Sequence, residues 1–459
     1  MRKNIAIALG LFAIYSPPAA RCNASAALNR QQTAFLASPN PALMDDRIAI
    51  KMTGLPPNRE ITIGAASRDQ GGCWWRSSAV FVARGDGSID LSAMAPVLGT
   101  YAGADAMGLF WSMQPDRRAG PVPAFFAVAD WFKPIETEIQ AALDGRVLGT
   151  ARVIRYFAAP GVRAEPFGRD GVVGILYRMG DGRKHPGVIL LGGSEGGFPA
   201  PQGAMLASRG YVVLALAYFG TNGLPAAMQR IPIEYFGNAI HSMLTLPEVE
   251  GAAISIMGGS RGGEAALMVS ATYPQVNGVA AASASHVRWE GATARMLPGG
   301  PAWTYEGKPL AYVPLHIGPV FAVHWLWAAV TGGPVSLRPM FVDSLGRVEN
   351  HDAEIPVERI RGPVLFGSGD ADREWPSGTM SQLAMDRLRR NHHPYADAHV
   401  SYEGAGHWLP CEYLPTGGLL GRMADEIGGT PAGTAAAQRQ WWPRVLGFLA
   451  GIGSRHGGR

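Results

Sequence analysis

The sequence predicts an α/β protein in which an N-terminal antiparallel β-sandwich is followed by a parallel sheet covered by helices. Short segments of alternating polar and apolar residues occupy the first third of the 459-residue chain. Beyond about Arg163, continuous apolar runs alternate with helical stretches, as in sheets whose two faces are both buried. The length exceeds that of one ordinary core, so more than one domain is expected.

The N-terminus has the pattern of an export signal. Two basic residues, Arg2 and Lys3, precede the apolar run Ile5–Tyr15, and the small residues Ala24–Ala26 offer a cleavage site. We therefore expect residues 1–26 to be a signal peptide and the mature protein to be periplasmic or secreted. The apolar run is too short to cross a bilayer as a helix, so no integral membrane span is expected after its removal.

Residues 36–145 are predicted to form the sandwich. Their apolar segments have a period of two and are separated by turn residues such as Gly85-Asp86-Gly87. The expected strands include Ile48–Met52, Ile61–Ile63, Ala79–Val82, Ala124–Ala129 and Ile135–Ile139.

Residues 150–455 are predicted to form the larger α/β domain. The pattern of Ala435–Leu449, with its clustered tryptophans, indicates an amphipathic helix that closes the chain. The buried parallel strands expected here include Val188–Leu191, Tyr211–Ala217 and Ala253–Met257.

A Trp-rich section broken by Gly and Pro lies between Trp289 and Arg347. Its centre, Phe321–Val330, is almost wholly apolar. This run could form a lid over an acyl pocket, but a buried core helix is the more common use of such a segment.

Composition excludes several classes of function. The net charge is only +4 and the basic residues are scattered singly, so nucleic acid is not an expected partner. After signal removal only Cys73 and Cys411 remain, which permits at most one disulfide and no thiol metal cluster. The group of His392, His393, Asp397 and His399 resembles a metal site in composition, but a solvated helix end and turn explains it better.

The pattern G-x-S-x-G occurs twice, around Ser194 and around Ser260. Ser260 follows the apolar strand sequence AISIM and precedes the helix-forming sequence GEAALMVSA. Strand, tight turn and helix are what a catalytic nucleophile elbow requires, with Gly258 and Gly262 letting strand and helix pass closely. Ser194 is followed by residues that break helices, so we assign it to a loop.

A base and an acid follow Ser260 in the order that an α/β-hydrolase uses. His407 lies in a glycine-flanked loop after the strand sequence AHVSY. Asp370 and Asp372 follow another predicted strand, which lies between Ser260 and His407 in the chain. The order Ser260, Asp372, His407 is that of a catalytic triad, although spacing alone does not choose between the two aspartates.

Backbone N–H groups near Ser260 are expected to stabilise the oxyanion. The N–H of Arg261 would supply one donor, and the glycine-rich loop would supply another from Ser194 or Glu195. The Arg261 side chain could attract a phosphate-bearing thiol leaving group, but an outward ion pair at the helix start is the simpler expectation.

Several segments together resemble the family of type I acyl-CoA thioesterases and bile acid-CoA:amino acid N-acyltransferases. They are YAGADAMGLFWSM, PGVILLGGSEGG, ASRGYVVLALAYFG, LPAAMQRIPIEYFGNAI, LPEVEGAAISIMGGSRGGE, GSGDADREWPS and GAGHW. The resemblance runs from about Pro39 to Leu449. It implies an α/β-hydrolase with an N-terminal immunoglobulin-like β-sandwich, and an acid three residues before Trp375, which is Asp372.

The resemblance also implies an activity. The family's thioesterases use serine and its acyltransferases use cysteine, so Ser260 implies hydrolysis of a fatty acyl-CoA, without metal or other cofactor. An exported carboxylesterase or amide hydrolase and an amino acid N-acyltransferase are the alternatives. Because acyl-CoA is cytoplasmic, either the substrate is a different acyl ester, thioester or amide outside the cytoplasm, or synthesis starts further along, for instance at Met44, and the protein is cytoplasmic.

Overall fold

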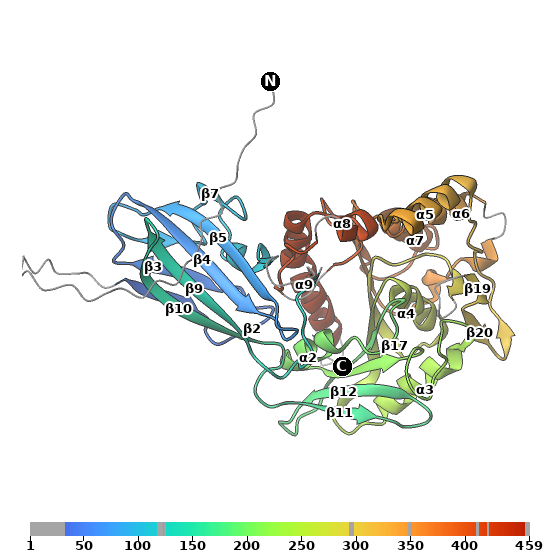
Figure 1. Ribbon diagram of the computed structural model, residues 1–459. Helices are drawn as coiled ribbons and strands as arrows, with labels where there is room; N and C mark the ends of the chain where they lie inside the picture. The colour runs from blue at the N-terminus through green and yellow to red at the C-terminus, as the bar shows by residue number, and fades with distance from the viewer. Residues whose placement is uncertain are drawn as a thin grey trace, which may run out of the picture. The chain divides into compact units, whose positions relative to one another are not determined.

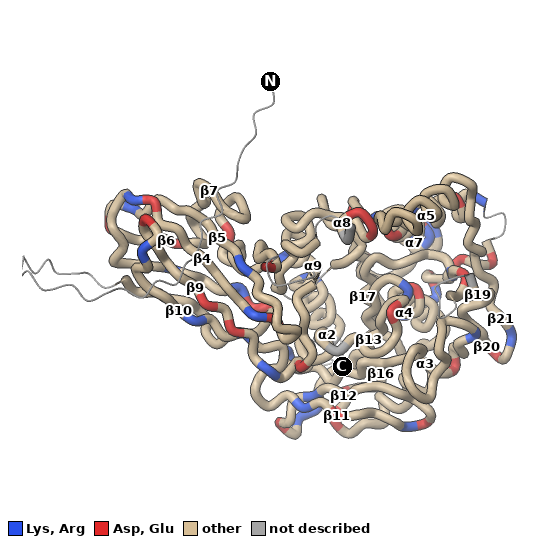
Figure 2. The backbone as a smooth tube through the Cα atoms, in the orientation of Figure 1, with Lys and Arg blue, Asp and Glu red and all other residues tan. Residues whose placement is uncertain are grey.

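In a computed structural model of the protein, the described residues are 33–116, 123, 125–292, 298–347, 351–409, 413–419 and 422–454. The expected signal peptide lies outside them. Within this described part, no helix is both long and apolar enough to cross a membrane. Figure 2 shows acidic and basic residues interspersed along the chain.

The N-terminal part is built from two antiparallel-rich sheets, which Figure 1 draws in blue to green. Ile50 and Met52 of the first sheet and Ile61, Ile63 and Phe81 of the second are buried in one core, as expected of a sandwich. The first sheet has the order β1 (Ala34–Ser38), β3 (Ala49–Thr53), β6 (Ile89–Asp90). The second has the order β2 (Ala42–Leu43), β10 (Arg146–Tyr156), β9 (Ile135–Leu143), β4 (Glu60–Arg68), β5 (Trp74–Val82), β7 (Leu98–Gly99). Strand β8 (Gln114–Pro115) pairs with β5, and helix α1 spans Gly108–Trp111.

This part differs from the sequence prediction in two places. Asp144 and Gly145, with φ of 48° and 78°, form the turn of a hairpin between β9 and β10, so β10 of the same sheet begins at Arg146, just after the predicted end of the sandwich. The expected strand Ala124–Ala129 is irregular in its described residues, 125–129. Its backbone bonds to a turn instead, since Ala127 O accepts a hydrogen bond from the Gln70 N–H.

The C-terminal part contains an eight-stranded sheet in which every strand except β12 runs in the same direction. This order and direction confirm the expected α/β-hydrolase topology. The order is β11 (Val162–Phe167), β12 (Val173–Met179), β14 (Val212–Ala217), β13 (His185–Leu191), β16 (Val249–Gly259), β17 (Val276–Ala282), β22 (Val364–Gly369), β23 (Ala398–Tyr402).

Helices cover both faces of this sheet (Figure 1). Leu190, Val213 and Ala280 pack in one core with α2 (Ala200–Ser208) and α9 (Pro431–Ser454). Their neighbours in the strands point the other way, into a core with α3 (Ile233–Leu244), α4 (Arg261–Thr272) and α7 (Ser377–Arg390). Burial on both faces explains why these strands are continuous apolar runs in the sequence.

Short elements lie between β17 and β22 and after β14 and β23. They are β15 (Ile231–Pro232), β18 (Glu290–Ala292), β19 (Pro298–Pro301), β20 (Trp303–Tyr305), β21 (Lys308–Pro309), the 3-10 turns His351–Ala353 and Val357–Arg359, and α8 (Arg422–Ile427).

Helix α5 (Pro319–Thr331) shows that the expectation of a core helix in the Trp-rich section is wrong. Only Phe321 and Ala328 of this helix are buried, whereas Val320 and Val330 are 72% and 80% exposed. The apolar sequence is therefore largely presented to solvent, beside α6 (Arg338–Gly346). Apolar composition predicts burial only where enough partner surface exists to cover the helix, and here it does not.

Candidate active site

Ser260 lies on a strained turn between β16 and α4. Its φ of 55° and ψ of −125° are unusual for a residue with a side chain and indicate local strain. A Cβ atom at Gly258 would lie 2.2 Å from the carbonyl oxygen of Gly262, and a Cβ at Gly262 would lie 2.3 Å from that of Gly192. Only glycine fits at either position, so the pentapeptide holds strand, helix and the neighbouring loop in close contact.

Ser194, the other serine in this pattern, lies in a turn between β13 and α2. That turn packs directly against Ser260, because a Cβ atom at Gly193 would lie 3.3 Å from the Cβ of Ser260. The two matches to one motif therefore occupy different positions, a strand-to-helix elbow at Ser260 and an adjoining loop at Ser194.

His407 and Asp372 form a hydrogen-bonded pair. The Nδ1 of His407 lies 2.9 Å from Oδ2 of Asp372, and because a carboxylate only accepts, Nδ1 carries the proton. This leaves Nε2 without a proton and able to act as a base. Asp372 is 2% exposed, and its Oδ1 accepts hydrogen bonds from the backbone N–H groups of Glu374 and Trp375.

Asp370, the other candidate acid, does not bond to the histidine. Its Oδ1 accepts the backbone N–H of Gly404 at 2.8 Å, on an exposed turn. The geometry therefore separates two aspartates that spacing could not distinguish.

The charges around His407 change its basicity. Burial lowers the pKa of His407, since its side chain is only 14% exposed, but the charge and hydrogen bond of Asp372 raise it. The carboxylates of Glu374 and Glu195 add to this attraction, and the net pKa lies above the ordinary value. Burial in turn raises the pKa of Glu374.

Ser283 connects Ser260 and His407, and no motif in the sequence singled it out. The Ser260 N–H donates to the carbonyl oxygen of Ala282 at 2.9 Å, and the next side chain, Ser283 Oγ, donates to the backbone carbonyl of His407 at 2.7 Å. The indole N–H of Trp375 donates to the carbonyl of Ser283. Ser283 also has a positive φ of 45° and is buried.

These contacts bring Ser260 and His407 to the same edge of the sheet. In the described part of the chain, the Ser260 hydroxyl forms no hydrogen bond with the imidazole or with another group. Catalytic hydrogen bonds are often loose in unliganded enzymes and tighten when substrate binds. The arrangement therefore supplies a base fixed by an acid, and a strained serine at the same edge of the sheet.

The elbow and the adjoining loop both contain backbone N–H groups that are without an acceptor in the described part of the chain. Among the described hydrogen bonds, the N–H groups of Arg261, Ser194 and Glu195 have no acceptor. The Gly193 N–H, in contrast, donates to Oε1 of Glu195 at 2.9 Å. The start of α4 adds its positive dipole end to the same region. This combination can stabilise an oxyanion formed on a substrate carbonyl carbon attacked by Ser260.

The side chain of Arg261 points into the protein, so both expectations for it, phosphate attraction and an outward ion pair, are wrong. Its guanidinium lies 3.2 Å from the fully buried Glu264 and donates to the carbonyl of Trp289. Glu264 also accepts from the indole of Trp303. Burial raises the pKa of Glu264, and the charge of Arg261 opposes that rise. The pair anchors the first turn of α4 beneath the serine.

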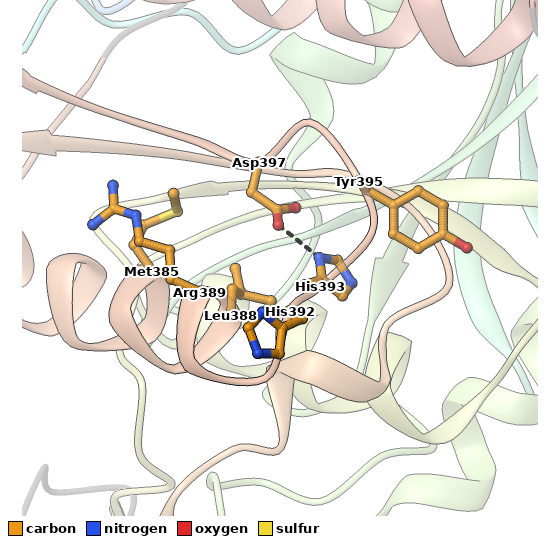
Figure 3. A pocket seen from close by; sticks show the side chains of 7 residues that line it. All are labelled: Met385, Leu388, Arg389, His392, His393, Tyr395 and Asp397. Carbon is orange, nitrogen blue, oxygen red and sulfur yellow. Dashed lines mark hydrogen bonds and ion pairs between the residues drawn. The ribbon is translucent and has the colours of Figure 1, made fainter.

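The His392 group is a separate site, on the opposite edge of the sheet. His393 shares a 2.6 Å hydrogen bond with Asp397 and a second with the carbonyl of Ile360, beside a cavity of about 280 Å³ (Figure 3). His399 instead bonds to Ser368 through Nε2. Among the described residues, no three His, Cys, Asp or Glu side chains converge as metal ligands. Cys73 has a free thiol, and Cys411 lies outside the described residues.

Two family models match the chain. Residues 45–167 match the acyl-CoA thioester hydrolase/BAAT N-terminal region, and residues 231–452 match the BAAT/acyl-CoA thioester hydrolase C-terminal region. Among solved structures, a putative dienelactone hydrolase from Klebsiella pneumoniae subsp. pneumoniae MGH 78578 is 13% identical, with a TM-score of 0.39 over 63% of this chain and 98% of that one. The first match covers most of the sandwich and ends with β11 of the eight-stranded sheet, and the second lies within the C-terminal part.

Curated relatives match nearly the whole chain. Human acyl-coenzyme A thioesterase 1 is 30% identical over 88% of this chain and 93% of its own length. Mouse acyl-coenzyme A amino acid N-acyltransferase 1 is 29% identical, covering 90% and 96%. Mouse peroxisomal succinyl-coenzyme A thioesterase is also 29% identical, covering 90% and 95%. The chain belongs to the family of acyl-CoA thioester hydrolases and bile acid-CoA:amino acid N-acyltransferases.

Proposed function

We propose that the protein hydrolyses acyl thioesters, releasing a fatty acid and CoA, through an acyl-enzyme on Ser260. The observation that carries this proposal is the strained serine at the same sheet edge as the His407–Asp372 pair, in a chain of a thioester hydrolase family. Strain at a position that glycine-rich packing enforces is a common feature of catalytic residues.

The first half of the reaction forms the acyl-enzyme. His407 Nε2 removes the proton of Ser260 as Oγ attacks the thioester carbonyl carbon, and Asp372 stabilises the resulting imidazolium. The N–H of Arg261 and one from Ser194 or Glu195 hold the oxyanion, and each such donor typically contributes about 10²–10³ in turnover. The carbon–sulfur bond breaks, and the thiolate leaves with a proton from His407.

The second half regenerates the serine. His407 removes a proton from water, whose oxygen attacks the acyl carbon of the ester. The same N–H groups hold the second oxyanion. The bond to Oγ breaks, the proton returns from His407 to Ser260, and the fatty acid departs. The reaction thus returns Ser260 and His407 to their starting protonation states, and every step uses a residue of this chain.

The direct test compares the wild type with Ser260→Ala on acyl-CoA substrates of several chain lengths, with free thiol as the readout. We expect the variant to lose at least about 10³ in kcat, because no other nucleophile is held in the elbow. Circular dichroism of both proteins is the folding control. Equal rates in the two proteins would remove the proposed mechanism.

Acyl transfer to an amino acid is the second candidate, and the N-acyltransferase relatives favour it. The family resemblance weakens it, since its acyltransferases are expected to carry cysteine where this chain has Ser260. Mass spectrometry of reactions with glycine or taurine separates the two activities. Conjugates formed faster than free acid would favour transfer. An exported carboxylesterase, the other alternative, would cleave oxygen esters faster than the matching thioesters.

Export is part of the proposal and rests on the basic and apolar pattern of residues 1–26. An exported enzyme would meet acyl esters or thioesters outside the cytoplasm. N-terminal sequencing of the protein from cell fractions tests this. A mature N-terminus close to Ala26 in the periplasm or medium is expected, and an intact Met1 or a start at Met44 in the cytoplasm would contradict export.

A further inference from the structure

The carboxylate of Glu195 lies directly beside the proposed nucleophile. Its Oε1 accepts the Gly193 N–H at 2.9 Å, so the side chain folds back over its own loop. A Cβ atom at Gly193 would lie 2.7 Å from Oε2 of Glu195 and 3.3 Å from the Cβ of Ser260. The carboxylate and the serine therefore flank the same glycine.

This charge is not neutralised by a basic side chain. Within the described residues, Glu195 forms no salt bridge, and the nearby Arg261 is held by Glu264. The residue is exposed, and its charge reaches His407, whose pKa it helps to raise. The other carboxylates near the histidine differ, because Asp372 is paired with the ring and Glu374 is half-buried, with a pKa raised by desolvation. Glu195 is therefore an exposed negative charge beside the elbow at Ser260.

We infer that Glu195 restricts the enzyme to acyl groups that carry no negative charge close to the thioester carbonyl, an inference that rests on the proposed function. A carboxylate two to four carbons from the carbonyl would lie on the order of 10 Å from Glu195, which is comparable to the Debye length of about 10 Å at 0.1 M salt. The two like charges repel each other at that distance. The CoA phosphates lie beyond the pantetheine arm and are screened. Monocarboxylic fatty acyl groups are thus accepted, and succinyl groups are selected against.

The test uses two substrates of equal size. Succinyl-CoA ends in a carboxylate, and 4-methylpentanoyl-CoA carries an isopropyl group in its place. In the wild type we expect kcat/KM for succinyl-CoA to be the lower of the two. In Glu195→Gln the ratio of succinyl to 4-methylpentanoyl kcat/KM should rise about fivefold to tenfold, because the like charge is gone. Because the measured quantity is a ratio of two kcat/KM values, a variant that loses activity equally on both substrates leaves it unchanged.

Two control variants separate the effect of the charge at Glu195 from that of its side-chain shape and from that of the protein's net charge. Glu195→Asp keeps the charge, and its ratio should stay within about threefold of the wild type. Asp370→Asn removes one negative charge from another exposed turn carboxylate that accepts a single backbone N–H, and its ratio should not change. A ratio that is the same in the wild type and Glu195→Gln, or that rises equally in Asp370→Asn, would overturn the inference.

Ionic strength gives a second measurement that needs no variant. Raising salt from about 0.05 M to 0.5 M screens exposed charges, so the wild-type ratio should rise and that of Glu195→Gln should stay flat. A flat wild-type ratio would count against the inference. If neither thioester is hydrolysed, the proposed thioesterase function fails, and p-nitrophenyl esters of the same two acyl groups then measure the ratio independently.

Discussion

Replacing Asp372 with asparagine should abolish most activity through the tautomer of His407. In the wild type, Oδ1 of Asp372 accepts the N–H groups of Glu374 and Trp375 at 2.9 and 3.2 Å. These two donors would fix the asparagine oxygen at the same place. Its NH₂ group would then occupy the position of Oδ2, which faces His407 Nδ1 at 2.9 Å.

A donor at that position forces Nδ1 to become an acceptor and moves the ring proton to Nε2. The base then cannot take the proton of Ser260. In a serine hydrolase triad the same change costs about 10⁴ in kcat, or about 5 kcal/mol of transition-state stabilisation at roughly 1.4 kcal/mol per factor of ten. Because asparagine is the same size as aspartate, the fold should tolerate it.

The assay is thiol release from an acyl-CoA across a pH series. The wild type needs neutral His407, so kcat/KM should rise with pH through the raised pKa of that histidine. Without the Asp372 carboxylate, the burial of the ring remains and its largest attraction is lost, so the pKa of His407 should fall and the residual activity of Asp372→Asn should titrate at lower pH. The matched variant Asp370→Asn loses one exposed hydrogen bond, and its kcat should stay within about threefold of the wild type. The reasoning fails if Asp370→Asn is the more damaged protein, or if Asp372→Asn keeps a tenth of the activity.

Two further variants test how the elbow and the histidine loop are held. Gly262→Ala places a methyl group 2.3 Å from the carbonyl oxygen of Gly192. We expect this clash to lower the free energy of unfolding by about 1–3 kcal/mol and to cause a large loss of kcat. A melting temperature equal to that of the wild type would show that the packing argument is wrong. Ser283→Ala removes the hydrogen bond to the His407 carbonyl and should lower kcat about tenfold with a small change in melting temperature, since one buried hydrogen bond contributes about 1 kcal/mol. An unchanged kcat and pH profile in Ser283→Ala would mean that the loop is held by other contacts.

The sequence predicted those features that depend on local pattern. Buried parallel strands such as β14 are apolar at every position because helices cover both faces of the sheet. The elbow at Ser260 was recognisable because strand, glycines and helix are adjacent in the chain. The choice of Asp372 over Asp370 came from family resemblance, and the structure supports it through burial and the contact with His407.

Features that depend on distant segments were not predictable in this way. Ser283 bonds to a residue far along the chain, and its surrounding sequence, AASASH, contains no turn signal. The inward direction of Arg261 depends on Glu264 and on backbone supplied by Trp289. Helix α5 is as apolar as a core helix, and only the packing of neighbouring elements reveals that most of it is exposed. In each case the missing information is which segments meet in three dimensions.

The most direct measurement of the central claim is the position at which a fluorophosphonate probe attaches. The probe reacts with a serine whose hydroxyl is activated by a neighbouring base, so peptide mass spectrometry should locate the adduct on Ser260. Attachment at Ser194, or a wild-type protein that does not react, would contradict the assignment of the nucleophile.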